Sequence, residues 1–347
     1  MTIPFVTVIV PTRDEERYIA ATLDSILATA YPRDQLEVLV VDGASRDRTA
    51  TIVTEYATRH HAVRLIHNPA RTAPAALNLG IRAARGEIIV RMDAHVVYPP
   101  QYLPRAVSAL LESGADNVGG VITTRAATPT PMGRAIALGL SHPLGVGNSY
   151  FRIGSAERRW VDTVPFGCWR RSLFDRIGLF DEELVRNQDD EFNFRTQQRG
   201  GRVLLVPDLI ATYYARAKLR DVARMYYQYG YFKPLVARKL GRIMTARQLV
   251  PSAFLLGLAG SAVLAPWLAA GWLAFGLIAG AYALAVGTAA LAALRRHEVR
   301  VALALSAVFV VLHVGYGFGF LRGVVDHVLL RGRRAPVADR AALAPTR

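Results

Sequence analysis

Short apolar runs alternate with longer amphipathic stretches along residues 1–91. The apolar runs lie at 5–10, 37–41, 63–66 and 87–91. The helix-like stretches between them lie at 15–29, 48–59 and 73–84. Short runs without polar alternation are typical of strands that are buried on both faces. Strand and helix repeated with short links predict an α/β fold, a mainly parallel sheet with helices on both faces.

The last third of the chain has a different pattern. Residues 248–294 and 301–321 contain no Asp, Glu, Lys or Arg. A membrane crossing needs about 20 apolar residues, so the first run is long enough for two crossings and the second for one. Pro266 and Gly271, with tryptophans beside them, predict a hairpin turn at the lipid headgroups. Two very apolar core helices are the alternative.

The positive charge gathers around these apolar runs. The chain has a net charge of +15, of which residues 216–247 carry +8 and residues 248–347 carry +6. A nucleic-acid-binding protein would carry its basic patch on the folded domain. The excess here indicates positive-inside charge and contact with anionic lipid, and no nucleic-acid partner.

These observations divide the chain into four parts. We expect a folded α/β domain at 1–215, a basic amphipathic interface segment at 216–247, transmembrane helices at 248–330 and a basic tail at 331–347. Three crossings that start inside would place the arginines of the tail outside, against the charge rule, so the number of crossings stays open between two and four.

The amino-terminal sequence and the cysteine content indicate the compartment. Residues 1–11 show neither a positively charged start nor a small-residue cleavage site, so we expect no secretory signal. A single cysteine, Cys168, excludes a disulfide scaffold and is expected to be a small buried residue. We therefore expect a multi-pass protein of the inner (plasma) membrane with a cytoplasmic catalytic domain.

Polar residues follow three of the predicted strands. They are Pro11-Thr12-Arg13-Asp14-Glu15, then Asp42-Gly43-Ala44-Ser45-Arg46-Asp47, then Asp93-Ala94-His95. Ligands of parallel sheets bind at the carboxyl ends of the strands. A glycine-rich dinucleotide fingerprint and a phosphate loop are both missing from the sequence, which argues against dehydrogenases and P-loop NTPases. In the structural alternative, these residues only form turns and helix caps.

The residue types suit a nucleotide and a metal ion. Asp42 can accept a hydrogen bond from a base N–H, and Asp93 and His95 can both reach one divalent cation. Carboxylate oxygens suit Mg²⁺ or Mn²⁺, and an imidazole favours Mn²⁺. A diphosphate clamped by such a cation is a leaving group.

As an ordered set these motifs resemble glycosyltransferase family 2 with the GT-A fold, in which a mixed, mainly parallel sheet is flanked by helices. The resemblance includes Asn68-Pro69-Ala70-Arg71 and Asn78-Leu79-Gly80. Residues 163–171, the Gln188–Phe192 stretch and the apolar tail resemble its membrane-attached, succinoglycan-synthesis (ExoA-like) branch, which adds a C-terminal helical transmembrane region. The similarity covers roughly residues 4–330.

The resemblance implies roles for individual residues. Asp93 and His95 match the metal motif, with His95 in place of its usual second Asp. Asp189 matches the catalytic Asp of a Glu-Asp motif in which Gln188 replaces the Glu. The implied nucleotide-sugar-binding residues are Pro11, Thr12, Glu15, Asp42, Ser45, Arg71 and Asp93. The implied acceptor-side residues are Gly167, Trp169, Asp190 and Glu191.

Chemistry supports Asp189 as a general base. A sugar hydroxyl that attacks an anomeric carbon must lose a proton, and a nearby carboxylate accepts it while the metal-bound diphosphate leaves from the opposite face. A single displacement of this kind inverts the anomeric centre. Asp190 or Glu191 is the base if the register is shifted, and residues 187–191 only cap a helix in the structural alternative. Trp169 either stacks on a sugar ring or fills the core.

The expected function is that of an inverting glycosyltransferase. It moves a hexose from a nucleotide diphosphate sugar of the uridine type, with Mn²⁺ or Mg²⁺, to a lipid-linked saccharide in extracellular polysaccharide or cell-envelope glycan synthesis. Met225 and Gln228 replace residues of the processive relatives' motif, which favours the addition of a single sugar. A polyprenyl-phosphate sugar synthase and a non-catalytic nucleotide-sugar-binding membrane protein remain alternatives.

Overall fold

The computed structural model describes residues 3–243 and 245–330, and the chain divides into two compact units. Unit 1 combines residues up to Thr123 with Tyr150–Tyr213, and unit 2 combines Thr124–Ser149 with the chain from Tyr214 onward. The predicted domain 1–215 is continuous, whereas the structure assigns Thr124–Ser149 to unit 2. The reason is that helix α5 (Pro131–Gly139) of this segment packs against helix α13 (Val299–Val324).

Unit 1 is built on one mixed sheet. Its strands are β1 (Val6–Thr12), β2 (Leu36–Asp42), β3 (Val63–His67), β4 (Ile88–Arg91), β5 (Val96–Val97), β6 (Asn117–Arg125), β7 (Arg159–Trp160), β8 (Cys168–Arg170) and β9 (Val203–Tyr214). Their order is β3-β2-β1-β4-β8-β6-β9-β5, and β7 pairs with β9. The first four strands are parallel. The strand β8 is antiparallel to both β4 and β6, so the sheet is mixed, as predicted.

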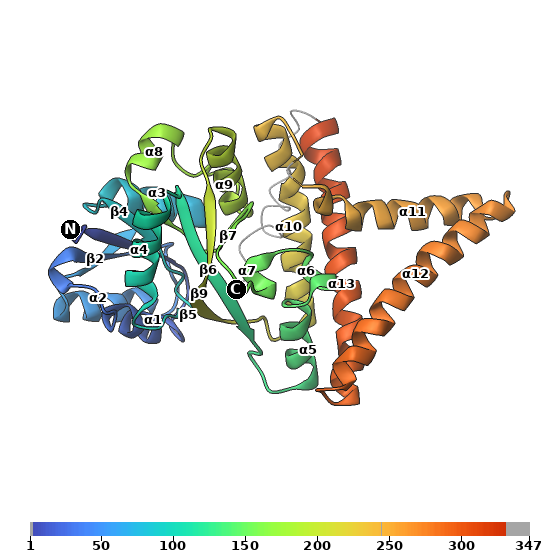
Figure 1. The fold of residues 1–347 in the computed structure, drawn as a ribbon, viewed down its shortest axis with the longest axis horizontal. Coiled ribbons are helices and arrows are strands. Elements are labelled where there is room, and N and C mark those ends of the chain that lie inside the picture. The colour runs from blue at the N-terminus through green and yellow to red at the C-terminus, as the bar shows by residue number, and fades with distance from the viewer. Residues whose placement is uncertain (1–2, 244, 331–347) are drawn as a thin grey trace. The chain divides into compact units, whose positions relative to one another are not determined.

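Each face of the parallel half is covered by its own helices, and the side-chain alternation of β1 shows how. Val8 and its alternate neighbours pack into a core that includes α1 (Ile19–Leu27), α2 (Thr49–Arg59) and α4 (Tyr102–Ser113). Ile9 packs into a second core, and the helices of that core are α3 (Ala73–Ala83), α8 (Ser172–Ile177) and α9 (Gln188–Gln198). The predicted three-layer α/β arrangement is therefore present (Figure 1).

Unit 2 is helical. Besides α5 and α13 it contains α6 (Pro143–Val146), α10 (Leu219–Leu240), α11 (Val250–Leu264) and α12 (Ala269–Leu294); a short helix of unit 1 is α7 (Tyr150–Ile153). Among the described residues, Ala269–Leu294 and Val299–Leu329 are long and apolar enough to cross a membrane. The helix α11 has 15 residues and is shorter. The link between α11 and α12 contains Pro266 and Trp267, which lie at the position of the predicted hairpin turn.

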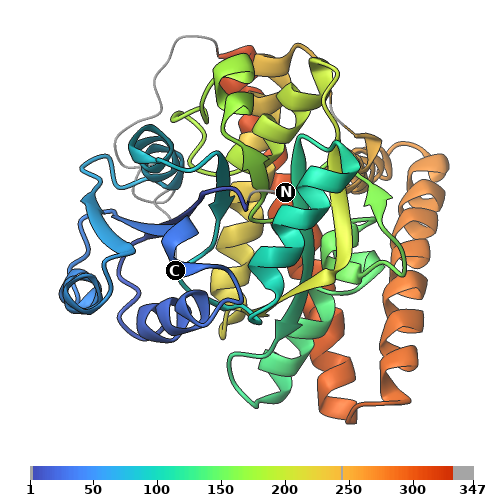
Figure 2. The same ribbon diagram turned by 60° about the vertical axis from the view of Figure 1, so that its left-hand side comes forward.

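The helices α10 and α13 lie side by side in both views (Figures 1 and 2). A Cβ atom added at Gly319 would lie 2.0 Å from the carbonyl oxygen of Tyr227, and one at Gly323 would lie 2.2 Å from that of Tyr231. A Cβ at Gly230 would lie 2.0 Å from the carbonyl oxygen of Tyr316. The two backbones therefore touch through glycine, as in tightly packed membrane helices.

This packing uses part of the predicted interface segment. On α10, Met225 is 3% exposed and Gln228 is fully buried. The face of α10 that carries them therefore packs inside unit 2. Five of the nine basic residues of 216–247 lie on the same helix: Arg220, Arg224, Lys233, Arg238 and Lys239.

Candidate functional site

The loops after β1 and β2 are joined by side-chain hydrogen bonds at the carboxyl edge of the sheet. Ser45 donates its backbone N–H to Asp42 Oδ2 at 3.0 Å and its hydroxyl to Asp42 Oδ1. The same hydroxyl oxygen accepts the N–H of Asp14 at 2.7 Å. Asp42 therefore forms a turn, which is the purely structural role given above as the alternative to ligand binding. Its contact with a nucleotide base stays a prediction.

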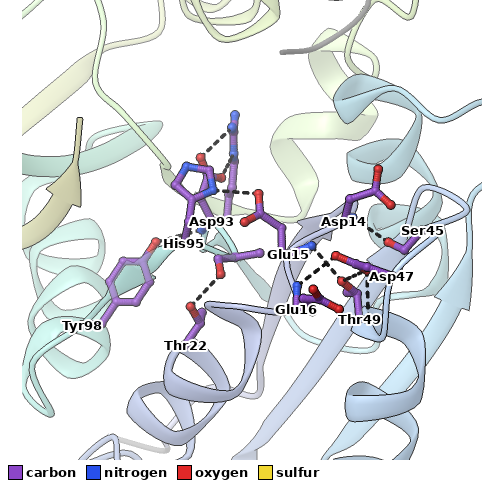
Figure 3. Close-up of polar contacts among 12 residues, drawn as sticks. Asp14, Glu15, Glu16, Thr22, Ser45, Asp47, Thr49, Asp93, His95 and Tyr98 are labelled. Atoms are coloured by element: carbon purple, nitrogen blue, oxygen red, sulfur yellow. Dashed lines mark hydrogen bonds and ion pairs between the residues drawn. The ribbon is translucent and has the colours of Figure 1, made fainter. Parts of the chain in front are cut away.

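A second set of hydrogen bonds between these two loops centres on Asp47, as Figure 3 shows. Its carboxylate accepts hydrogen bonds from the hydroxyl of Thr49 at 2.6 Å and from the N–H of Glu16 at 3.2 Å. The N–H of Glu15 donates to the Thr49 hydroxyl oxygen at 2.7 Å. Burial alone would raise the pKa of Asp47, but the hydrogen bonds from Thr49 and from backbone N–H groups outweigh it and lower the pKa. These hydrogen bonds hold the loops after β1 and β2 to each other.

Five non-glycine residues of the described chain have a left-handed backbone, and all belong to unit 1. Their φ angles lie between 55° and 64°. L-residues rarely adopt this conformation, and such strain concentrates at functional sites. The residues are Asp14, Ala44, Arg71, Phe166 and Asn187. They follow β1, β2 and β3 and precede β8 and α9.

The loop after β4 positions the two predicted metal ligands. The N–H of Asp93 donates to the hydroxyl oxygen of Tyr98 at 2.8 Å. Burial, and secondarily the charge of Asp93, hold the pKa of Tyr98 well above its ordinary value, so this residue remains a neutral phenol. His95 Nδ1 lies 3.0 Å from Glu15 Oε1, and the two side chains point toward each other in Figure 3. Glu15, on the loop after β1, thereby reaches the loop after β4.

Arg91 at the end of β4 is the site residue that the sequence analysis did not assign a role. Its Nε donates to Asp93 Oδ1 at 2.7 Å and its Nη2 to Asp93 Oδ2 at 3.2 Å. Its Nη1 donates to Asp189 Oδ1 at 2.5 Å. One guanidinium therefore joins the predicted metal ligand and the predicted base. The sequence does contain a signal for this role, since Arg91 is the last residue of a buried strand and a buried charge needs partners of opposite charge.

The electrostatics of this trio are coupled. Burial alone would lower the pKa of the Arg91 guanidinium, but Asp189 and Asp93 raise it above its ordinary value. Burial raises the pKa of the Asp189 carboxyl, Arg91 acts against that rise, and Asp93 adds to it. Asp189 thus has an acidity intermediate between that of an exposed carboxylate and that of an isolated buried acid, which suits a group that accepts a proton.

The residues that follow Asp189 differ in their surroundings. Asp189, Asp190 and Glu191 occupy the first turn of α9, where the helix dipole favours negative charge. Glu191 is 3% exposed, and both of its oxygens accept hydrogen bonds from Arg195, at 2.7 and 2.9 Å. Glu191 therefore stabilises the fold around α9, and the contact with Arg91 distinguishes Asp189 as the base candidate. Asp190 is half-buried.

Trp169 packs in the core beside the site, and Gly167 holds the backbone of Arg91. Trp169 is 3% exposed, and its ring lies 5.8 to 6.1 Å from those of Phe174, Phe180 and Phe192. A ring that stacks on a sugar needs an exposed face, so the structure favours the core role of Trp169 over the acceptor role. The carbonyl oxygen of Gly167 accepts the N–H of Arg91 at 3.0 Å.

The end of β1 carries a buried polar atom without a hydrogen-bond partner. Among the described residues, Thr12 Oγ1 is buried and has no hydrogen-bond partner. A bound ligand that supplies this partner would remove the cost of leaving the hydroxyl unsatisfied. Pro11 is half-buried and Arg71 is exposed, on a loop held by the hydrogen bond from the N–H of Asn68 to the carbonyl oxygen of Asp42 at 2.7 Å.

The donor set fits a cation that is shared with phosphate. Within residues 3–243 and 245–330, no three His, Cys, Asp or Glu side chains are grouped closely enough to hold a metal ion by themselves. The side chains of Asp93 and His95 are 19% and 37% exposed and thus accessible to solvent. Mg²⁺ and related ions in nucleotide sites use one or two protein carboxylates together with substrate phosphates. Asp93 supplies one such carboxylate and His95 would add an imidazole, so these residues fit a cation whose remaining ligands come from a diphosphate.

The conserved pattern of glycosyl transferase family 2 matches residues 7–178 of this chain. The matched span runs from the second residue of β1 to beyond β8 and includes both predicted metal ligands. The chain belongs to glycosyl transferase family 2. The predicted family, the GT-A fold and the glycosyltransferase class are thereby confirmed.

Three similar proteins extend the match beyond this span. The chain is 28% identical over 321 residues to the succinoglycan biosynthesis protein ExoA of Rhizobium meliloti, covering 92% of this chain and 94% of that protein. It is 29% identical over 245 residues to the dolichyl N-acetyl-alpha-D-glucosaminyl phosphate 3-beta-D-2,3-diacetamido-2,3-dideoxy-beta-D-glucuronosyltransferase of Methanococcus voltae, covering 68% and 74%. The solved mannosyltransferase PcManGT from Pyrobaculum calidifontis, in complex with GDP-Man and Mn²⁺, shares the fold with a TM-score of 0.58 at 23% identity, covering 91% and 87%.

Proposed function

We propose that this family 2 glycosyltransferase transfers a hexose, with inversion, from a UDP-sugar to a lipid-linked saccharide at the cytoplasmic face of the plasma membrane. The observation that carries the proposal is the shared guanidinium of Arg91, because it brings Asp93 and Asp189 into one site. Asp93 marks the diphosphate side, and Asp189 marks the side from which the acceptor hydroxyl attacks.

In this proposal Asp189 removes the proton of the acceptor hydroxyl. Its Oδ1 is held by Arg91 at 2.5 Å, and 31% of its side chain is exposed to an incoming ligand. The guanidinium favours the ionised form of the carboxylate, which is the form that accepts a proton. Arg91 thus orients the base, and the base acts on the acceptor.

The donor would lie along the edge formed by the loops after β1, β2 and β4. Thr12, Glu15, Asp42, Ser45 and Arg71, with Pro11, would line the base, ribose and phosphates. Asp93 and His95 would hold a Mn²⁺ or Mg²⁺ ion, which neutralises the charge that develops on the departing diphosphate. The missing partner of the Thr12 hydroxyl supports a ligand at this edge.

The helices of unit 2 and the names of two relatives support the proposed acceptor class and membrane location. The helices α12 and α13 are apolar enough to cross a membrane, and the basic residues of 216–247 adjoin them in sequence. The relative from Methanococcus voltae is named for a dolichyl-phosphate-linked sugar acceptor, and the one from Rhizobium meliloti for succinoglycan biosynthesis. A lipid-linked saccharide in polysaccharide or envelope-glycan synthesis is the acceptor class that agrees with both.

The test is a donor screen in membranes that contain the full chain, with Mn²⁺ and radiolabelled nucleotide sugars. We expect label from one donor to enter a lipid-extractable product, and we expect Asp189→Asn to abolish this incorporation by about 10²-fold or more. A polyprenyl-phosphate acceptor is already ionised and needs no base, so activity retained in D189N would contradict the proposal in favour of such a synthase. If no donor releases nucleoside diphosphate with any acceptor, a non-catalytic nucleotide-sugar-binding protein is favoured instead.

A further inference from the structure

Both predicted metal ligands already have partners within the protein. Two guanidinium nitrogens of Arg91 contact the two oxygens of Asp93, and Glu15 contacts Nδ1 of His95. A cation that binds without nucleotide would therefore meet two ligands that already interact within the protein. Arg91 offsets the charge of Asp93, and Glu15 contacts one ring nitrogen of His95. The described part of the chain offers no third ligand to compensate.

Arg91 also places a fixed positive charge beside any cation on Asp93. Its side chain is 9% exposed, and a guanidinium does not lose its proton in proteins. A divalent ion bound to Asp93 would lie close to this mostly buried charge, where water only weakly screens the repulsion between like charges. Two negative charges from a diphosphate would offset that repulsion.

The contact with Arg91 nevertheless leaves room on Asp93. A carboxylate has about four lone-pair positions, and the two hydrogen bonds from Arg91 use two of them. A cation can therefore bind the exposed side of Asp93 while Arg91 stays in place. The N–H of Arg91, held by the Gly167 carbonyl oxygen, keeps the backbone of this residue fixed.

We propose that Arg91 is a positioning residue that makes divalent-cation binding depend on the donor diphosphate, while it holds Asp189 toward the acceptor. This inference rests on the proposed function. The free protein binds the cation weakly because Arg91 offsets the charge of Asp93, and the nucleotide diphosphate strengthens cation binding by supplying negative charge. By thermodynamic linkage, the cation must tighten nucleotide binding by the same factor.

The experiment is isothermal titration calorimetry on the full chain in detergent, with Mn²⁺ alone, UDP alone and both together. For the wild type we expect Mn²⁺ to bind at least about tenfold more tightly when UDP is present, within the usual range for coupled sites. Arg91→Gln removes the positive charge, so we expect it to bind Mn²⁺ without UDP about tenfold more tightly than the wild type does. Arg91→Lys keeps the charge and should stay close to the wild type.

Two further variants keep the result interpretable. Arg91→Gln with Asp189→Asn removes one carboxylate along with the guanidinium, so the protein folds with less uncompensated charge and its gain in Mn²⁺ affinity should be smaller. Arg176→Gln removes an arginine that pairs with Asp116 in unit 1, outside the site, and should bind Mn²⁺ and UDP as the wild type does. A change in Arg176→Gln equal to that of Arg91→Gln would make the effect one of net charge and overturn the proposal.

The outcomes separate this inference from the proposed function. Tight Mn²⁺ binding to the wild type without nucleotide, or an unchanged affinity in Arg91→Gln, would overturn the role of Arg91 while leaving glycosyl transfer intact. No binding of UDP to the wild type, with or without Mn²⁺, would instead contradict the UDP-sugar function on which the inference rests.

Discussion

Arg91 and Asp189 are 98 positions apart in the chain, and Nη1 of the first lies 2.5 Å from Oδ1 of the second. One residue ends a strand of the parallel sheet, and the other lies in the first turn of α9, beyond the antiparallel strand β8. The contact links the nucleotide half of unit 1 to the half that we assign to the acceptor. A change in either half would therefore alter the surroundings of Asp189, the proposed base.

The first prediction concerns the pH dependence of the transfer. Burial raises the pKa of Asp189 and Arg91 opposes that rise, so the active, ionised form is lost as the pH falls through a value above the ordinary carboxyl range of about 4. Arg91→Gln removes the opposing charge. The pKa of Asp189 then rises further, and the acidic limb of the rate profile moves to higher pH.

Initial rates at saturating donor, measured from about pH 4.5 to 8 in wild type and in the residual activity of Arg91→Gln, give the two profiles. Arg176→Gln is the control and should keep the wild-type limb. An acidic limb that has the same midpoint in Arg91→Gln and in the wild type would show that Arg91 does not act on the titrating group.

The second prediction concerns the contact between α10 and α13. Gly319→Ala places a Cβ 2.0 Å from the carbonyl oxygen of Tyr227, which is backbone and cannot rotate away. The helices must separate, so we expect a loss of about 1–3 kcal/mol in the free energy of unfolding. Thermal unfolding in detergent, followed by tryptophan fluorescence, measures the loss as a lower transition temperature.

Gly276→Ala is the matched control for this prediction. Gly276 lies within α12, and a Cβ there would meet no atom within 4 Å. Alanine is the better helix former by up to about 1 kcal/mol, so this variant should be neutral or more stable. Equal losses in the two variants would mean that the α10–α13 contact contributes nothing specific.

The third prediction concerns the single cysteine. Cys168 is 1% exposed, and burial raises the pKa of its thiol far above the ordinary value, so the reactive thiolate is scarce at neutral pH. We expect no labelling of the native protein by a maleimide at about pH 7.5, and complete labelling after denaturation in SDS. Gel shift with a polyethylene-glycol maleimide measures both.

Ala156→Cys supplies the positive control, because residue 156 is exposed in unit 1. This variant should gain one fast-reacting thiol in the native state. Rapid labelling of Cys168 in the wild type would contradict its place in the core beside β4 and β6.

Much of the fold was predictable because its signals are local. The apolar runs at 37–41 and 63–66 correspond to β2 and β3 within one residue at each end, since a strand buried on both faces has few polar positions. The helix predicted at 73–84 is α3 to within one residue. The mixed character of the sheet also followed, but only through the resemblance to the family.

The rest depends on contacts between distant segments. Nothing within Thr124–Ser149 shows that its helix α5 packs on α13, because that packing is set by residues more than 150 positions later. Trp169 was compatible with a sugar platform and with the core, and only its phenylalanine neighbours from α8 and α9 decide between them. The sequence predicts only that Arg91 ends a strand, because its second partner, Asp189, lies on α9, far along the chain.

The left-handed residues around the sheet edge bear on how ligands are recognised. Ala44, Arg71 and Phe166 hold conformations that a free chain seldom visits, and the loops that carry two of them are tied together by Asp42 and Asn68. Their ordering is completed during folding and is not left to the encounter with a ligand. This edge should behave as a rigid receptor, whose selectivity for one nucleotide comes from a shape that the fold itself sets.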